Sequence, residues 1–238
     1  MTQEIAKAQG GSLMQAEKEQ RGFESGVDQR DLIIPRAKLI QALSPEMQEG
    51  LEGIKIGSII NSLTKEVLPD VFIPIFSFKN YIRFNPRSKD DPNFDADFEP
   101  GAIIWRSSDP SDPLVLEQTK FGPNGEKPVA TTFLNFFSFF PGVTMPVIVS
   151  FSKTSYRTGK QLLSLGKFCG GDMFSRKYRL TSQMETNIGT YAVLRVASIG
   201  EAAPEEFAVC ERLWNDFAAK AKDIQVHEED ATEEQRPY

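Results

Sequence analysis

The stretch Thr131–Thr181 constrains the fold more than any other part of the chain. Two apolar, aromatic-rich runs flank a Pro/Gly turn and predict the strands Thr131–Phe140 and Val147–Ser152. Most phenylalanines of the first run are expected in the core. Basic residues and further aromatics then follow at short intervals. Positive charge interleaved with aromatic rings on a strand-rich scaffold is typical of proteins that hold single-stranded nucleic acid. The alternative is a β-rich core with a basic surface.

Composition narrows the class of protein. The 238 residues are 40% hydrophobic, which is enough for a substantial core. No apolar run approaches the 18 residues of a membrane span, and the polar N-terminus lacks the apolar centre of a signal peptide. Two distant cysteines predict no disulfide or metal framework, so we expect a cytoplasmic protein. The single histidine, His227, excludes histidine-based triads from the core, and phosphate-binding P-loop and GxGxxG motifs are absent.

The charge is distributed unevenly along the chain. The formal net charge is -6, but residues 71–200 contain 15 basic and 11 acidic residues, and residues 201–238 contain 4 basic and 11 acidic. Residues 142–200 contain eight basic residues and only two acidic ones, Asp172 and Glu185. A basic centre flanked by acidic ends favours contact with nucleic acid together with an acidic tail.

The pattern of segments predicts a flexible arm over residues 1–30, a single domain over 31–222, and an acidic tail over 223–238. The domain is expected to be mainly β with peripheral helices. An OB-fold-like barrel with long loops and a C-terminal helix fits the order of elements, because OB folds often place a helix between their third and fourth strands; a β-sandwich is the competing architecture. Expected helices begin after Ser44 and span Thr154–Leu165 and Pro204–Lys222, and Leu114–Glu117 is expected to be a short strand.

The loop Ser88–Gly101 carries Asp90, Asp91, Asp95, Asp97 and Glu99. Hard cations take oxygen ligands, so this loop raises the alternative of a divalent-metal-dependent nuclease. The spacing does not fit an EF-hand, and no second acidic cluster completes a two-metal site. A solvated acidic loop is the expectation, with no metal and no cofactor.

The segment Pro146–Ser155, the pairs Gly159-Lys160 and Leu162-Leu163, the run Tyr178–Thr181 and the run Gly189–Tyr191 together resemble the OB-fold single-stranded-DNA-binding proteins of tailed bacteriophages. The acidic tail that ends in an aromatic residue is similar to the tails of such proteins. The resemblance covers roughly residues 70–238. It implies a protein that coats single strands during phage DNA replication or recombination and recruits partner proteins through its tail.

A sequence-nonspecific single-stranded-DNA-binding protein, not an enzyme, is therefore the function that we expect. Lys and Arg would neutralise phosphates, and aromatic side chains would stack on bases. The expected contacts are Lys79, Tyr81, Arg83, Arg87, Trp105, Lys153, Tyr156, Arg157, Lys160, Arg176, Lys177 and Tyr178.

Partners other than DNA are also part of this hypothesis. The acidic tail would occupy the basic surface when DNA is absent and bind replication or recombination proteins when DNA is present. No membrane partner is expected, and self-association is left open. A protein-interaction or virion structural module remains the alternative to DNA binding.

Overall fold

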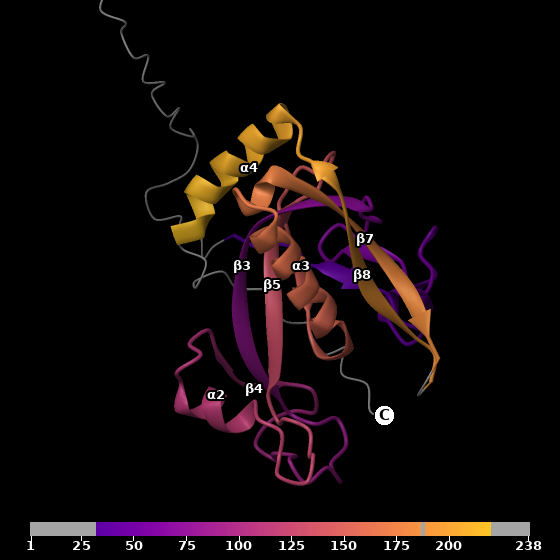
Figure 1. Cartoon of the computed structure of the whole chain (residues 1–238). Helices are drawn as coiled ribbons and strands as arrows, with labels where there is room; N and C mark the ends of the chain where they lie inside the picture. The colour runs from indigo at the N-terminus through magenta and orange to yellow at the C-terminus, as the bar shows by residue number, and fades with distance from the viewer. Residues whose placement is uncertain (1–31, 187–188, 220–238) are drawn as a thin grey trace, which may run out of the picture.

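A computed structural model describes residues 32–186 and 189–219. The predicted arm and acidic tail lie outside these ranges. The described residues form eight strands and four α-helices (Figure 1). The strands are β1 Ala37–Leu39, β2 Ile59–Asn61, β3 Val71–Phe84, β4 Ile103–Ser107, β5 Thr131–Phe139, β6 Val147–Phe151, β7 Arg176–Glu185 and β8 Tyr191–Glu201. The helices are α1 Pro45–Glu49, α2 Pro113–Gln118, α3 Tyr156–Phe168 and α4 Pro204–Phe217, with short 3-10 turns at Lys153–Ser155 and Met173–Ser175.

The long strand β3 is the centre of the larger sheet, whose order is β6-β5-β3-β7-β8 with β4 also paired to β3. It pairs with β5 along Ile73–Ile82, with β7 at its first two residues, and with β4 at its last four. All these pairings are antiparallel. The register shifts between Pro74 and Phe76, where β3 carries one residue more than β5 opposite it. This bulge reverses which side chains of β3 face each side of the sheet.

Both faces of the β3–β5 pair are buried, as the apolar residues on both faces predict. On one face, Phe72 and Phe136 belong to a core cluster with Leu162 of α3 and Leu194 of β8. On the other face, Phe137 and its neighbours pack against α4 and the turn that precedes β7. The sheet is therefore covered by α3 and the β7–β8 hairpin on one side and by α4 on the other (Figure 1). The expectation that most phenylalanines of Thr131–Phe140 are core residues is confirmed.

Close approach of backbone fixes α3 over the sheet. A Cβ atom added at Gly159 would lie 2.7 Å from Cβ of Phe151 in β6, so only glycine allows the helix to cross there. The Thr158 hydroxyl donates to the Leu194 carbonyl of β8 (3.0 Å). These two contacts fix the rotation of α3 about its axis and so decide which of its residues face solvent.

The helices follow the predictions in part. The helix α1 begins at Pro45 after Ser44, as predicted, and α3 continues three residues beyond the expected end at Leu165. The prediction of a strand at Leu114–Glu117 is wrong: these residues belong to α2, which Asp112 caps by accepting a hydrogen bond from the backbone of Leu114 (2.9 Å). Among the described residues, no helix combines the length and apolar character needed to cross a membrane.

The sheet remains open within residues 32–186 and 189–219. Its outermost strands are β6 and β8, and the segment that contains β1 touches both. The amide of Ile148 in β6 donates to the Pro35 carbonyl (2.9 Å), while the Gln41 side chain both donates to and accepts from the backbone of Ala192 in β8 (2.9 Å each). The mainly β fold with peripheral helices is confirmed, but the pairings do not close a barrel, so the OB-type barrel is not confirmed.

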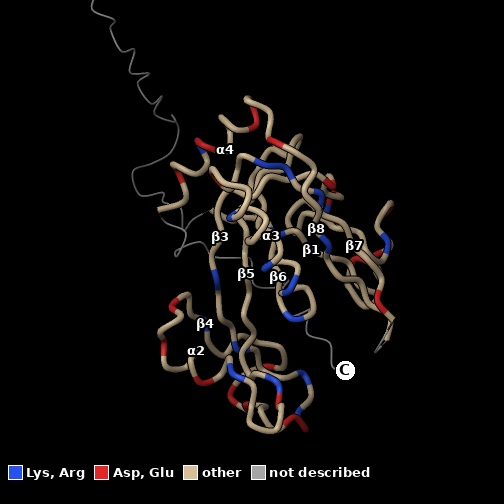
Figure 2. Tube along the Cα trace, in the orientation of Figure 1, with Lys and Arg blue, Asp and Glu red and all other residues tan. Residues whose placement is uncertain are grey.

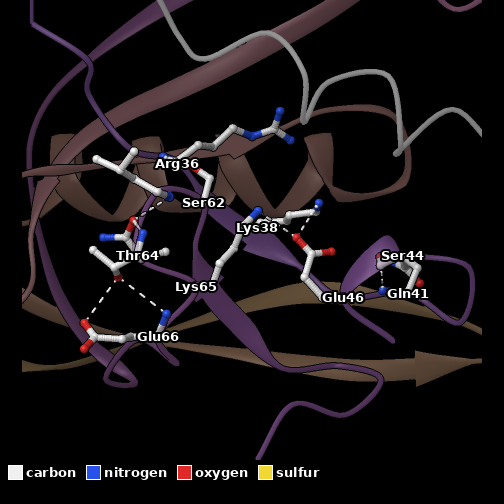
Figure 3. Close-up of polar contacts among 11 residues, drawn as sticks. Arg36, Lys38, Gln41, Ser44, Glu46, Ser62, Thr64, Lys65 and Glu66 are labelled. Atoms are coloured by element: carbon white, nitrogen blue, oxygen red, sulfur yellow. Dashed lines mark hydrogen bonds and ion pairs between the residues drawn. The ribbon is translucent and has the colours of Figure 1, made fainter. Parts of the chain in front are cut away.

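A buried charge cluster ties the β1–β2 pair to α1. Glu46 is 2% exposed, and its Oε1 accepts from Nζ of Lys38 (2.8 Å) and Nζ of Lys65 (3.0 Å); Figure 3 shows both lysines directed at this carboxylate. Burial alone would raise the pKa of Glu46. The hydrogen bonds from the two lysines and the backbone outweigh burial and lower the pKa from 4.5 to about 2. The carboxylate therefore stays ionised in the folded protein.

We expect Glu46 to make the free energy of unfolding depend on pH. Because the folded pKa lies below the unfolded value, this stabilisation is complete above pH 4.5 and is lost as the pH falls to about 2. Glu46→Gln should remove that part of the pH dependence. It should also destabilise the protein by about 3–5 kcal/mol at pH 7, since Lys38 stays buried without its carboxylate.

Urea unfolding from pH 7 to pH 2 measures both effects. Glu49→Gln, on an exposed position of the same helix, is the control and should change stability by less than about 0.5 kcal/mol. An unchanged difference between the pH 7 and pH 2 stabilities in Glu46→Gln would contradict the assignment.

Candidate nucleic-acid interface

The outer face of α3 is a basic surface. Arg157, Lys160, Ser164 and Lys167 are all exposed, and at 3.6 residues per turn they fall within about 80° of the helix circumference. We call these four residues the α3 stripe. The buried residues of the helix, such as Gly159 and Leu162, lie on the opposite side. The helix contains no acidic residue, and Figure 2 shows basic positions along it without acidic ones.

The cations of the α3 stripe are not neutralised by other residues of the described ranges. Within the described part of the chain, none of Arg157, Lys160 and Lys167 makes an ion pair, although the Lys160 ammonium lies over the Tyr156 ring at 5.7 Å from its centroid. Tyr156 itself is half-buried and packs against the core. The stripe therefore presents positive charge to solvent, where a phosphate backbone can reach it.

Lys79 is exposed and lies on the same side of the sheet as α3. It pairs with Leu134 of β5, which pairs with Phe151 of β6, and α3 crosses above Phe151. Two strand spacings, about 10 Å, separate Lys79 from this crossing point. Lys79 thus contributes one cation beside the α3 stripe. Lys153, also exposed, lies in the 3-10 turn that leads into α3.

Arg176 lies close to the other end of the helix. The final turns of α3 pack on the beginning of β7, since a Cβ atom at Gly166 would be 3.9 Å from the Tyr178 hydroxyl. Arg176 is the first residue of β7 and is half-buried. Lys177, next along the strand, forms an ion pair with Glu206 of α4 (Nζ to Oε2, 3.1 Å), so its charge is already compensated.

Two aromatic residues of the predicted set lie in the core instead of at the surface. Tyr178 is 0% exposed and packs 6.1 Å from the Phe72 ring, and Tyr81 is 7% exposed. A buried ring offers no face to a base, so both are removed from the set of expected contacts. The strand alternation explains Tyr178, because Leu180 points the same way into the core while Arg179 points outward.

The remaining members of the predicted set lie in or towards a lobe formed by residues 85–130, which includes β4 and α2 and lies beyond the end of β3 (Figure 1). Arg83 donates to the Asn93 carbonyl (3.4 Å), and Trp105 is half-buried and donates to the Gln118 side chain (3.0 Å). Arg87 is exposed within the lobe. The lobe contains nine acidic and five basic residues, so its charge does not favour DNA.

Hydrogen bonds between side chains and backbone groups hold the acidic loop of this lobe in place. The side chain of Asn85, which is fully buried, donates to the carbonyls of Asp95 (2.9 Å) and Phe98 (2.7 Å) and accepts from the amide of Asp95 (2.9 Å). Asp91 and Asp95 each accept a backbone amide two residues later. Among the described residues, no group of three or more His, Cys, Asp or Glu side chains is arranged to hold a metal ion.

The set of contacts expected from the sequence does not include Lys167 and Phe168, which are exposed in the last turn of α3. Both belong to the basic and aromatic stretch recognised from the sequence, but the expected helix ended before Gly166. In the structure Gly166 is buried where α3 packs on the residues before β7, and the helix continues through it. A glycine that allows close packing looks the same in a sequence as a glycine that ends a helix.

We expect Tyr178→Phe to leave the affinity for an oligonucleotide unchanged. The free energy of unfolding should stay the same or rise by up to about 1 kcal/mol. The Tyr178 hydroxyl is buried and has no hydrogen-bond partner among the described residues, so its removal relieves an unsatisfied group. Urea unfolding and titration with a labelled oligonucleotide measure the two quantities. A clear loss of affinity at unchanged stability would show that Tyr178 touches DNA.

Comparisons with known proteins connect the chain to phages. A family model described as Pam3 phage gp34-like protein matches residues 6–223, which is most of the chain. No curated protein matches the chain, and neither does any solved structure.

Proposed function

The chain belongs to the Pam3 phage gp34-like family, and we propose that it binds single-stranded DNA without sequence preference. The observation that carries the proposal is the α3 stripe: an exposed helix face with three cations and no acidic residue, in a protein of net charge -6. Cations that are spaced along one face and not paired by neighbours can neutralise successive phosphates and release counterions. Such contacts are independent of base sequence.

The uneven distribution of charge favours binding of a polyanion at one surface over nonspecific adsorption to the whole protein. Acidic residues concentrate in the lobe of residues 85–130, and residues 131–200 contain eight basic and two acidic residues. A polyanion is therefore attracted to α3 and repelled by the lobe. The proposed path runs along the α3 stripe from Lys79 and Lys153 towards Arg176.

The OB-like architecture is part of the same proposal. The segment Pro35–Gln41 contacts both outer strands of the sheet, β6 and β8, and so bridges the opening that an OB barrel would close. Coating of single strands during phage DNA replication or recombination, in the host cytoplasm, is the role that we propose. Recruitment of partner proteins through the acidic tail belongs to the same proposal.

Binding across a salt series tests the proposal. Fluorescence anisotropy with a labelled oligo-dT and with a duplex of equal length should show preference for the single strand and an affinity that falls steeply with salt. Replacing Arg157, Lys160 and Lys167 with Ala should reduce the slope of log affinity against log salt by about 2, since each phosphate contact to a single strand contributes about 0.7.

The matched control replaces three exposed lysines away from α3, namely Lys55, Lys89 and Lys120, and should leave the slope nearly unchanged. Equal affinity for single strands and duplex, or the same slope for both triple variants, would overturn the proposal.

A protein-interaction role is the second candidate, and exposed apolar side chains favour it. Phe121, Leu114 and Leu116 are 72%, 44% and 48% exposed in the lobe of residues 85–130. Exposed apolar side chains gathered in one region mark protein interaction sites. Absence of salt-sensitive binding to any oligonucleotide would favour this second function.

A further inference from the structure

Phe168, the last residue of α3, is 87% exposed. Full burial of a phenylalanine side chain stabilises a folded protein by about 1.5–3 kcal/mol, and the exposed Phe168 ring provides almost none of this stabilisation. Its placement is therefore not explained by packing within the protein. The helix needs no phenylalanine at this position for its own formation either, since the aromatic residues are poorer helix formers than Ala, Leu or Lys.

The ring lies on the same face of the helix as the α3 stripe. At 100° per residue, Phe168 falls between Arg157 and Gln161 on the helix circumference, and the six exposed residues of this face share a sector of about 120°. The distance along the axis from Arg157 to Phe168 is about 17 Å at 1.5 Å per residue. Lys167 precedes the ring directly. An exposed aromatic thus ends a row of cations.

The chain turns away immediately after the ring. The backbone of Cys169 is in the right-handed α conformation. Gly170 and Gly171 follow with φ of +73° and +75°, values that glycine adopts without strain. No atom lies within 4 Å of the position that a Cβ of Gly170 would occupy. The 87% exposure of Phe168 shows that this loop does not cover the ring. A right-handed residue followed by one of positive φ also allows successive backbone N–H groups to converge on an anion.

We propose that Phe168 is a stacking platform for one base of a single strand whose phosphates lie along the α3 stripe. This inference rests on the proposed function and assigns the base contact to a residue outside the sheet. The strand has its phosphates beside Arg157, Lys160 and Lys167, places a base on the Phe168 ring, and continues towards Arg176. Duplex DNA keeps its bases stacked inside the helix and has none to place on the ring, so Phe168 gives the site its preference for single strands.

The test compares two exposed phenylalanines. Phe168→Ala should weaken binding to oligo-dT by about 5- to 150-fold, since stacking on an aromatic contributes about 1–3 kcal/mol per base. The salt slope and the weaker binding to duplex should stay unchanged, because no cation is removed. Phe121→Ala, at a 72% exposed position of the acidic lobe, is the control and should bind like the wild type. Phe168→Trp should retain affinity, and DNA should quench the added fluorescence beyond that of Trp105 and Trp214.

The outcomes separate this inference from the function it rests on. If the wild type binds single strands and Phe168→Ala binds equally well, the stacking assignment is overturned and the DNA-binding function stands. If Phe168→Ala and Phe121→Ala lose affinity equally, the assignment is also overturned. If the wild type does not bind oligonucleotides, the proposed function fails, and the assignment fails with it.

Discussion

The structure depends on burying both faces of the β3–β5 pair. Phe136 and Phe137 are neighbours in β5, and each is fully buried in a different core. A strand pair that is apolar on both faces must be covered twice. The first cover is α3 with the β7–β8 hairpin, and the second is α4. Because α3 needs only one apolar side for this purpose, its other side is left to solvent, and that side carries the α3 stripe.

Close packing decides the orientation of that helix. Gly159 lets α3 contact Phe151 directly, and Thr158 fixes it to β8 by a hydrogen bond. A helix rotated by a third of a turn would bury a cation and expose Leu162. Burying an unpaired charge costs far more than any stabilisation by surface contacts, so the rotation is well determined. The direction of the basic face is therefore a consequence of the core.

Local signals in the sequence were sufficient where one element decides its own structure. Ser44 and Pro45 marked the beginning of α1, and the phenylalanines of Thr131–Phe140 marked a buried strand. Signals that depend on partners were not sufficient. Tyr178 was grouped with its basic neighbours, although its position two residues before Leu180 places both on one face of β7. The burial of that face follows from packing against Phe72 and the last turns of α3. Leu114–Glu117 was too short for periodicity to separate strand from helix.

The sequence indicated which types of residue make up the candidate site but not which of them share one surface. Clusters of basic and aromatic residues were visible in the sequence, yet only the fold separates Lys79, which faces the side of α3, from Arg87 in an acidic lobe. The pairing of Lys177 with Glu206 links residues 29 positions apart, which no local pattern reveals. Lys167 and Phe168 were left out of the expected contacts because Gly166 was interpreted as the end of the helix. In the structure this glycine allows close packing inside α3.

Hydrogen exchange of the full-length protein with and without saturating oligo-dT, read by mass spectrometry, tests most directly where DNA binds. If DNA binds the solvent face of α3, exchange becomes slower in peptides that cover α3 and the loop to β7 and stays unchanged in peptides from residues 85–130. Protection confined to the lobe of residues 85–130, with α3 unchanged, would contradict binding of nucleic acid at the solvent face of α3.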